Sequence, residues 1–143
     1  MIDRCPWSDT DELYRAYHDQ EWGKPVHDER THFEFLLLET MQAGLSWRLI
    51  LGRREDYRRE FAGFDWLQVM DFDETRIESL MQAPGLIHNR AKLVAAVRNA
   101  RSFEAVRQEV GSFDRYIWSF TDGKPLVNRH DSQSAIPVRT DLS

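Results

Sequence analysis

The sequence predicts an all-α fold. Three features support this prediction: apolar residues recur at steps of three and four, capping residues precede several of these runs, and no region is rich in strand signals. The chain has 143 residues, 41% of them hydrophobic and 30% charged. It contains no apolar run near the roughly 18 residues that cross a bilayer. We therefore expect one helical domain over residues 1–143 and no membrane partner.

The longest helix before the middle of the chain is expected from about residue 29 to residue 43. Asp28 can cap its start and Gly44 can end it. The apolar residues within it lie at helical spacing and are Phe33, Leu36, Leu37 and Met41. We expect this to be the central helix of the domain.

Shorter helices are predicted to follow. Ser46 is a capping candidate for a helix over 47–53, and another segment can continue through residues 57–61 until Gly63 interrupts it.

A helical hairpin is predicted beyond these segments. Asp73 can cap a helix whose apolar side holds Ile77 and Leu80, Pro84 and Gly85 form a turn, and a second helix is expected over 89–101. Residues 113–120 form a further aromatic, helical segment before a turn at 121–125. The tail over 128–143 has only scattered apolar residues, so we expect it to be poorly ordered.

The charge of the chain is unevenly distributed. The net charge of −5 argues against nonspecific attachment to nucleic acid, because binding to phosphates depends on accumulated Lys and Arg. The stretch 84–107 is the exception, since it carries five basic residues and one acidic residue, Glu104. The basic residues are Arg90, Lys92, Arg98, Arg101 and Arg107. We expect this stretch to form any surface that faces a polyanion.

Glu39 interrupts the most apolar stretch of the chain, LLLETMQAGLSW. A carboxylate beside aromatic faces suits a flat cationic group, and Tyr17, Trp22 and Trp47 are candidates to supply those faces. A modified purine would fit such a pocket. The alternatives are that Glu39 points into solvent at the end of its helix and that the aromatic residues only build the core.

The predicted hairpin APGLIHNRAKLVAAVRNA is a second candidate site. A helix start presents free N–H groups to anions, so the turn at Gly85, with Asn89, Arg90 and Lys92 after it, is a candidate grip for a DNA phosphate. The alternative is an ordinary helical hairpin with a solvated basic face.

Cys5 and His18 could supply two ligands to a structural zinc ion, which requires four. The equally acceptable alternative is a free thiol and a solvated imidazole. Motifs of serine hydrolases, P-loop proteins, zincins and dinucleotide-binding folds do not occur in the sequence. The single cysteine and an acidic, polar N-terminus without a secretion signal favour the cytoplasm.

Five sequence blocks together resemble the DNA-3-methyladenine glycosylase I family. They are CPW at 5–7, YHDQEWGKPVHD at 17–28, LETMQAGLSW at 38–47, APGLIHNRAKL at 83–93 and YIWSF at 116–120. The resemblance implies a helix-hairpin-helix DNA glycosylase, a hydrolase of base excision repair that releases 3-methyladenine from alkylated double-stranded DNA. It implies no strand cleavage, because the stretch His88-Asn89-Arg90 lacks the lysine nucleophile of strand-cutting relatives.

The resemblance also implies roles for single residues. Glu39 would hydrogen-bond the extruded base and act as the catalytic group, Tyr17 and Trp22 would line the pocket, and Trp47 would stack on the purine. Cys5 and His18 would be two of four zinc ligands. The turn at Gly85, with Asn89, Arg90 and Lys92, would contact the DNA backbone.

Two departures from the family pattern qualify these implications. Family members continue past residue 143 to a His and a Cys that complete the zinc site, and His130 comes too early to replace them, so we expect no complete zinc site within this chain. The hairpin carries Leu86-Ile87 where generic hairpins have a Gly-containing loop. The alternative functions are a non-catalytic binder of damaged DNA or methylated purines and a helical scaffold for another protein. Whichever of these functions the chain has, we expect it to be a monomer.

Overall fold

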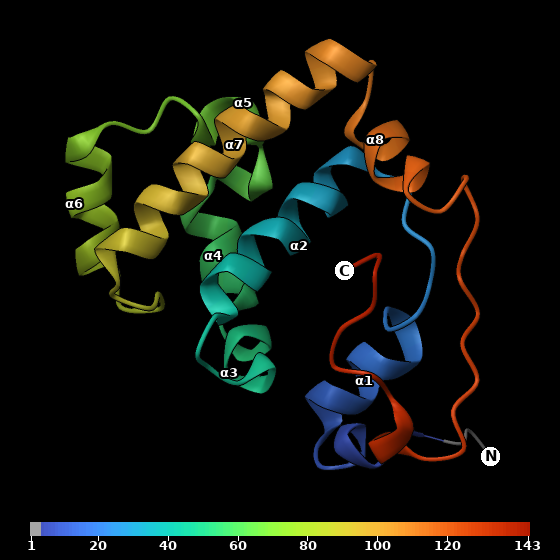
Figure 1. Cartoon of the computed structure of the whole chain (residues 1–143). Coiled ribbons are helices and arrows are strands. Elements are labelled where there is room, and N and C mark those ends of the chain that lie inside the picture. The colour runs from blue at the N-terminus through green and yellow to red at the C-terminus, as the bar shows by residue number, and fades with distance from the viewer. Residues whose placement is uncertain (1–3) are drawn as a thin grey trace.

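The computed structural model describes residues 4–143, which form helices joined by short loops and, within that range, no strand (Figure 1). This confirms the predicted all-α fold. The α-helices are α1 Glu12–Gln20, α2 Glu29–Gln42, α3 Trp47–Gly52, α4 Arg54–Glu60, α5 Trp66–Val69, α6 Glu74–Gln82, α7 Arg90–Val110 and α8 Phe113–Ser119. Short 3-10 helices are η1 Pro6–Ser8, η2 Ala62–Phe64 and η3 Gln133–Ala135.

Helices α2 and α7 form the centre of the molecule and pack against each other (Figure 1). Their facing sides are fully or almost fully buried because apolar residues repeat at three- and four-residue steps on both helices. Burial of each such large side chain stabilises the fold by about 1.5–3 kcal/mol. The buried residues are Phe33, Leu37, Leu38 and Met41 on α2, and Leu93, Ala96, Val97, Ala100 and Phe103 on α7.

The helix starts follow the predicted caps. The side chain of Asp28 accepts a hydrogen bond from the N–H of Thr31 at 2.9 Å, and Ser46, Asp73 and Asn89 accept from the N–H three residues further on in the same way. Each cap partners one helix N–H that has no partner within the helix. The starts of α2, α3, α6 and α7 were therefore correctly predicted.

Two features of the fold differ from the prediction. Helix α7 continues past the expected end at residue 101 to Val110, because Phe103 extends its buried face and only Gly111, with φ of 101°, ends it. Helices α1 and α5 were not predicted, because both are short and mix apolar and polar residues.

The last part of the chain lies apart from the helical core. Residues 128–143 are exposed throughout and contain only η3, which lies near α1 (Figure 1). The predictions of a single domain and of a poorly ordered tail stay predictions. Within residues 4–143, no helix combines the length and the apolar character needed to cross a membrane.

Candidate functional site

A pocket lined largely by aromatic rings lies where α1, the end of α2 and the start of α3 meet. Its volume is about 310 Å³. The sequence-predicted residues Tyr17, Trp22, Glu39 and Trp47 all lie in its lining. The remaining lining residues are Trp7, Tyr14 and Gln42. The structure thus brings together the acidic and aromatic residues that the sequence analysis grouped.

The rings of the pocket hold one another mainly edge to face. Tyr17 lies with its centroid 5.7 Å from that of Trp47 at 64°, and Trp7 meets Trp22 at 5.5 Å and 84°. Trp7 also contacts Tyr14 at 5.4 Å and 82°. Aromatic pairs favour such arrangements because the positive edge of one ring faces the negative face of the other. The walls are therefore apolar rings with electron-rich faces, suited to a flat or cationic ligand.

Among residues 4–143, Glu39 is the only acidic residue in the lining of this pocket. Glu39 is exposed, in line with the alternative that its side chain points into solvent at the end of the helix. It nevertheless borders the same cavity as the indole and phenol rings. Desolvation raises the pKa of its carboxyl group above the ordinary value. The negative charge of Glu39 in turn contributes to raising the pKa of Tyr17, after the larger effect of burial. The carboxylate is thus partly removed from water beside the aromatic walls.

Trp47, which lines the same pocket, carries a polar group that is buried. Its indole N–H is buried and makes no hydrogen bond within residues 4–143, although it lies near enough to the Tyr17 hydroxyl to act on the pKa of that phenol. A buried donor without a partner costs about 1–3 kcal/mol. The pocket lining therefore supplies one carboxylate acceptor, Glu39, whereas Trp47 Nε1 is an unused donor that lies buried.

Sequence reasoning did not assign a pocket role to Trp7, Tyr14 or Gln42. Trp7 and Gln42 lie inside the blocks CPW and LETMQAGLSW, so those blocks were the available signal for them. Tyr14 had no such signal. Its hydroxyl accepts a hydrogen bond from the N–H of Arg48 at 2.8 Å, which ties α1 to the start of α3.

Cys5 and His18 lie side by side, as the zinc prediction required. The N–H of Cys5 donates to His18 Nε2 at 3.4 Å, and His18 Nδ1 contacts Asp19 at 3.0 Å. However, residues 4–143 contain no group of three or more His, Cys, Asp and Glu side chains arranged to hold a metal ion. Two protein ligands do not fit the four-coordinate site of structural zinc.

The predicted DNA-contacting residues of the hairpin make contacts within the protein. Asn89 caps α7, Arg90 pairs with Glu74 and Glu78, and the ammonium of Lys92 donates to backbone carbonyls at the end of α2. Contact of this turn with DNA stays a prediction.

Gly85 lies directly against α4. A Cβ at this position would overlap the side chain of Asp56, so only glycine fits. The carbonyl of Gly85 accepts a hydrogen bond from Arg53 at 3.2 Å. The turn is therefore fixed against the body of the protein.

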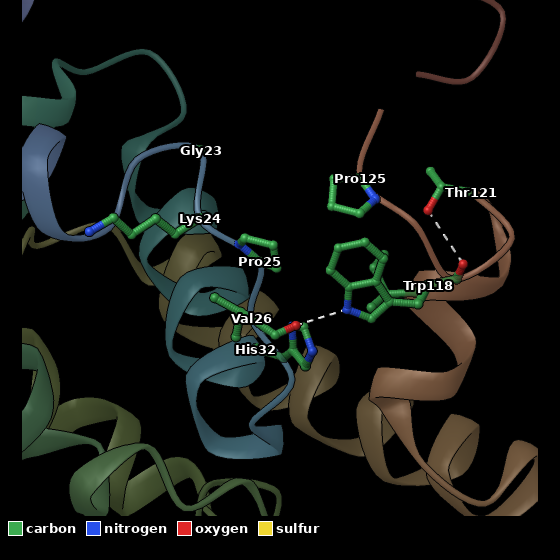
Figure 2. A pocket seen from close by; sticks show the side chains of 9 residues that line it. Gly23, Lys24, Pro25, Val26, His32, Trp118, Thr121 and Pro125 are labelled. Atoms are coloured by element: carbon green, nitrogen blue, oxygen red, sulfur yellow. Dashed lines mark hydrogen bonds between the residues drawn. The ribbon is translucent and has the colours of Figure 1, made fainter. Parts of the chain in front are cut away.

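A second hollow, of about 340 Å³, lies between the loop after α1 and helix α8 (Figure 2). It is lined by Pro25, Val26, Trp118 and neighbouring residues, and the indole N–H of Trp118 donates to the Val26 carbonyl at 2.8 Å. His32, at its edge, contacts Asp114 at 2.9 Å. Because these polar groups are already paired and no carboxylate of the described part of the chain lines the hollow, it is a weaker candidate than the aromatic pocket although it is slightly larger.

Comparison with known proteins agrees with the geometry of the aromatic pocket. A profile described as methyladenine glycosylase matches residues 7–143. The chain is 42% identical over 143 residues to DNA-3-methyladenine glycosylase of Haemophilus influenzae, covering all of this chain and 77% of that protein. It is 41% identical over 142 residues to DNA-3-methyladenine glycosylase 1 of Escherichia coli, covering 99% of this chain and 76% of that protein.

Solved structures show the same likeness. A crystal structure of 3-methyladenine DNA glycosylase I superposes with a TM-score of 0.94 at 43% identity, covering 98% of this chain and 77% of that one. A single-residue variant of such an enzyme in complex with 3-methyladenine superposes with a TM-score of 0.94 at 33% identity, covering 99% and 76% of the two chains.

Proposed function

The chain belongs to the methyladenine glycosylase family, and we propose that it hydrolyses the N-glycosidic bond of 3-methyladenine in alkylated DNA. The observation that carries this proposal is the aromatic pocket with Glu39 in its lining. Relatives of this chain are named for that reaction, and one similar structure holds 3-methyladenine.

The pocket is suited to a methylated purine rather than to normal adenine. Methylation at N3 places a positive charge on the ring, and the carboxylate of Glu39 attracts that charge while the face of Trp47 stacks on the purine and Tyr17 lines the pocket at an angle to it. Neutral adenine gains less from both contacts. Discrimination therefore follows from charge as much as from shape.

The same charge explains why recognition supplies much of the catalysis. A cationic base is already a good leaving group, so the enzyme need not protonate it. The nucleotide must first leave the stack, at a cost of a few kcal/mol that is smaller for a damaged pair. A carboxylate held in the pocket, as Glu39 is, also favours positive charge that develops on the sugar as the bond breaks.

Strand cleavage is not part of the proposed reaction. It would need an unprotonated amine to form a Schiff base with the sugar. The amine closest to the hairpin, on Lys92, donates to two backbone carbonyls at 2.7 and 2.6 Å and is thereby held as a hydrogen-bond donor. We infer a monofunctional glycosylase.

The experiment is a base-release assay on alkylated duplex DNA with the purified 143-residue chain. Hydrogen bonds to charged groups are worth about 1.5–3 kcal/mol, so Glu39→Gln is expected to slow release by roughly 10- to 150-fold. Trp47→Ala is expected to slow it as well. Glu109→Gln, at an exposed position of α7, is the matched control and should not change the rate. Unchanged release in both pocket variants would refute the assignment.

The same assay decides between this function and its rivals. Release of free 3-methyladenine excludes a binder without turnover. A scaffold for another protein predicts that neither alkylated DNA nor 3-methyladenine raises the melting temperature, whereas the glycosylase predicts a rise with either ligand.

A further inference from the structure

The end of α2 is held by a side chain from α7. The last carbonyl groups of a helix have no N–H partner within it. At the end of α2, the Gln42 carbonyl accepts from the N–H of Leu45, whereas the carbonyls of Met41 and Ala43 accept from Lys92 Nζ at 2.7 and 2.6 Å. A cation suits this place because the C-terminal end of a helix carries partial negative charge.

A second side chain of α7 holds the same turn. Asn99 Nδ2 donates to the hydroxyl of Thr40 at 3.0 Å, and that hydroxyl donates to the Leu36 carbonyl at 2.8 Å. Lys92 and Asn99 are seven residues apart, so they lie on one side of α7, two turns from each other. Helix α7 thus holds α2 at Thr40, Met41 and Ala43.

Residues directly beside these anchors line the aromatic pocket. Glu39 and Gln42 lie three apart on α2 and both border the cavity, and the chain continues through a short turn to Trp47, which lines it too. From 39 to 43, every residue therefore either lines the pocket or is held by α7. A shift of this turn would move Glu39 relative to the rings of Tyr17 and Trp22.

We propose that Lys92 is a positioning residue of the base pocket, assisted by Asn99, and not a ligand of the DNA backbone. The proposal rests on the proposed function for its activity readout. Lys92 lies near the start of α7, directly after the hairpin, and its ammonium reaches the end of α2. It thereby fixes the carboxylate of Glu39 relative to the helix that follows the hairpin.

The test compares Lys92→Met with Lys92→Arg, with Asn99→Ala and with a matched control, Lys124→Met, at an exposed position in the turn after α8. Four quantities are measured for each full-length variant. They are amide hydrogen exchange at residues 41–47, the single-turnover rate of base release at saturating DNA together with affinity for free 3-methyladenine, and the salt dependence of DNA binding.

The positioning role predicts a specific combination of results. Lys92→Met should speed exchange at residues 41–47, slow base release by about tenfold or more, and weaken binding of free 3-methyladenine. The slope of log K against log salt should stay as in the wild type. Lys92→Arg, which keeps a cation with several donors, should restore most of the rate, and Asn99→Ala should give a weaker version of the same effects with no change of charge. Lys124→Met should behave as the wild type.

A phosphate contact predicts the opposite result. Loss of one such contact lowers the salt slope by about 0.9 and leaves the rate at saturation and the affinity for free base unchanged. That result, or unchanged exchange at residues 41–47, would overturn the proposal. If Lys92→Met does not fold, Asn99→Ala decides the question by hydrogen exchange, the rate of base release and the affinity for free 3-methyladenine. A wild-type chain without base release would refute the proposed function, while hydrogen exchange would still decide the role of Lys92.

Discussion

Arg54 is the residue whose loss is expected to destabilise the fold most clearly, because it neutralises a buried carboxylate. It lies at the start of α4, and its Nε donates to Glu34 at 2.5 Å, while its two terminal nitrogens donate to the two carboxylate oxygens of Glu21 at 2.7 and 3.0 Å. Glu34 is on α2 and is only 6% exposed. Burial by itself lowers the pKa of Arg54, but hydrogen bonds with Glu21 and Glu34 outweigh it and raise the pKa above the ordinary value.

The size of the effect follows from what remains after Arg54→Met. Removing one partner of a buried ion pair costs about 3–5 kcal/mol, because the other charge stays buried without compensation. Arg58 still reaches the same oxygen of Glu34 at 3.2 Å, and since its side chain is 42% exposed it compensates only in part. Arg54 also stacks over the ring of Phe35, a contact worth about 0.5–1 kcal/mol. We expect a loss of about 3 kcal/mol in the free energy of unfolding.

Urea unfolding at neutral pH measures this loss. Arg59→Met is the matched control, because the Arg59 side chain is exposed, it pairs with Asp56 and Glu60 rather than with Glu34, and an exposed ion pair contributes about 0–1 kcal/mol. The double variant Arg54→Met with Glu34→Met should recover most of the stability, since apolar residues often replace a buried ion pair without net cost. A loss below about 1 kcal/mol for Arg54→Met would show that Glu34 is not effectively buried and would refute the reasoning.

Two further predictions concern the hairpin and the pocket. Gly85→Ala places a methyl group into the space held by the Asp56 side chain and should lower the free energy of unfolding, measured in urea, by about 1–3 kcal/mol. Adding Asp56→Ala should recover part of this loss. Equal stability of Gly85→Ala and wild type would contradict the close contact. Because desolvation raises the pKa of Glu39 above its ordinary 4.5, and only the ionised carboxylate attracts the cationic base of the intact nucleotide, the rate of base release from alkylated DNA should fall as pH drops through that raised pKa. Single-turnover rates against pH check this, and an acid limb at or below pH 4.5 would contradict it.

Local signals in the sequence were sufficient to predict the helices that pack in the core. The cap at Asp28 and the spacing of Phe33, Leu37 and Met41 predicted the start of α2 correctly and its end within a residue. The end of α7 could not be predicted in the same way. Helix α7 continues because Phe103 finds partners in Phe33, Trp66 and Phe113, and these contacts exist only once distant segments have packed.

The candidate site likewise combines residues that a local sequence block groups with residues that only the folded chain brings together. Glu39 and Trp47 are close in sequence, so their grouping was accessible from one block. Trp7 and Tyr14 join them only because η1 and α1 pack beside α3, a long-range contact that no local pattern encodes. Glu34 shows that two acidic residues of one helix can differ in burial for reasons that the local sequence does not contain. It lies five residues before Glu39 on the same helix, yet it is buried because Arg54 and Arg58 arrive from α4.

The basic residues after the hairpin differ in how firmly the protein itself holds them. Arg107 is partly buried and pairs with Glu29 and Glu104, and Lys92 is held by two backbone carbonyls, so neither is free to approach a phosphate. Arg90 is different. Its partners on α6, Glu74 and Glu78, are 73% and 59% exposed, and ion pairs of that kind contribute only about 0–1 kcal/mol. Arg90 can therefore exchange a carboxylate for a phosphate at little cost, and of the two cations predicted to contact DNA at the hairpin, Arg90 and Lys92, it remains the candidate for that contact.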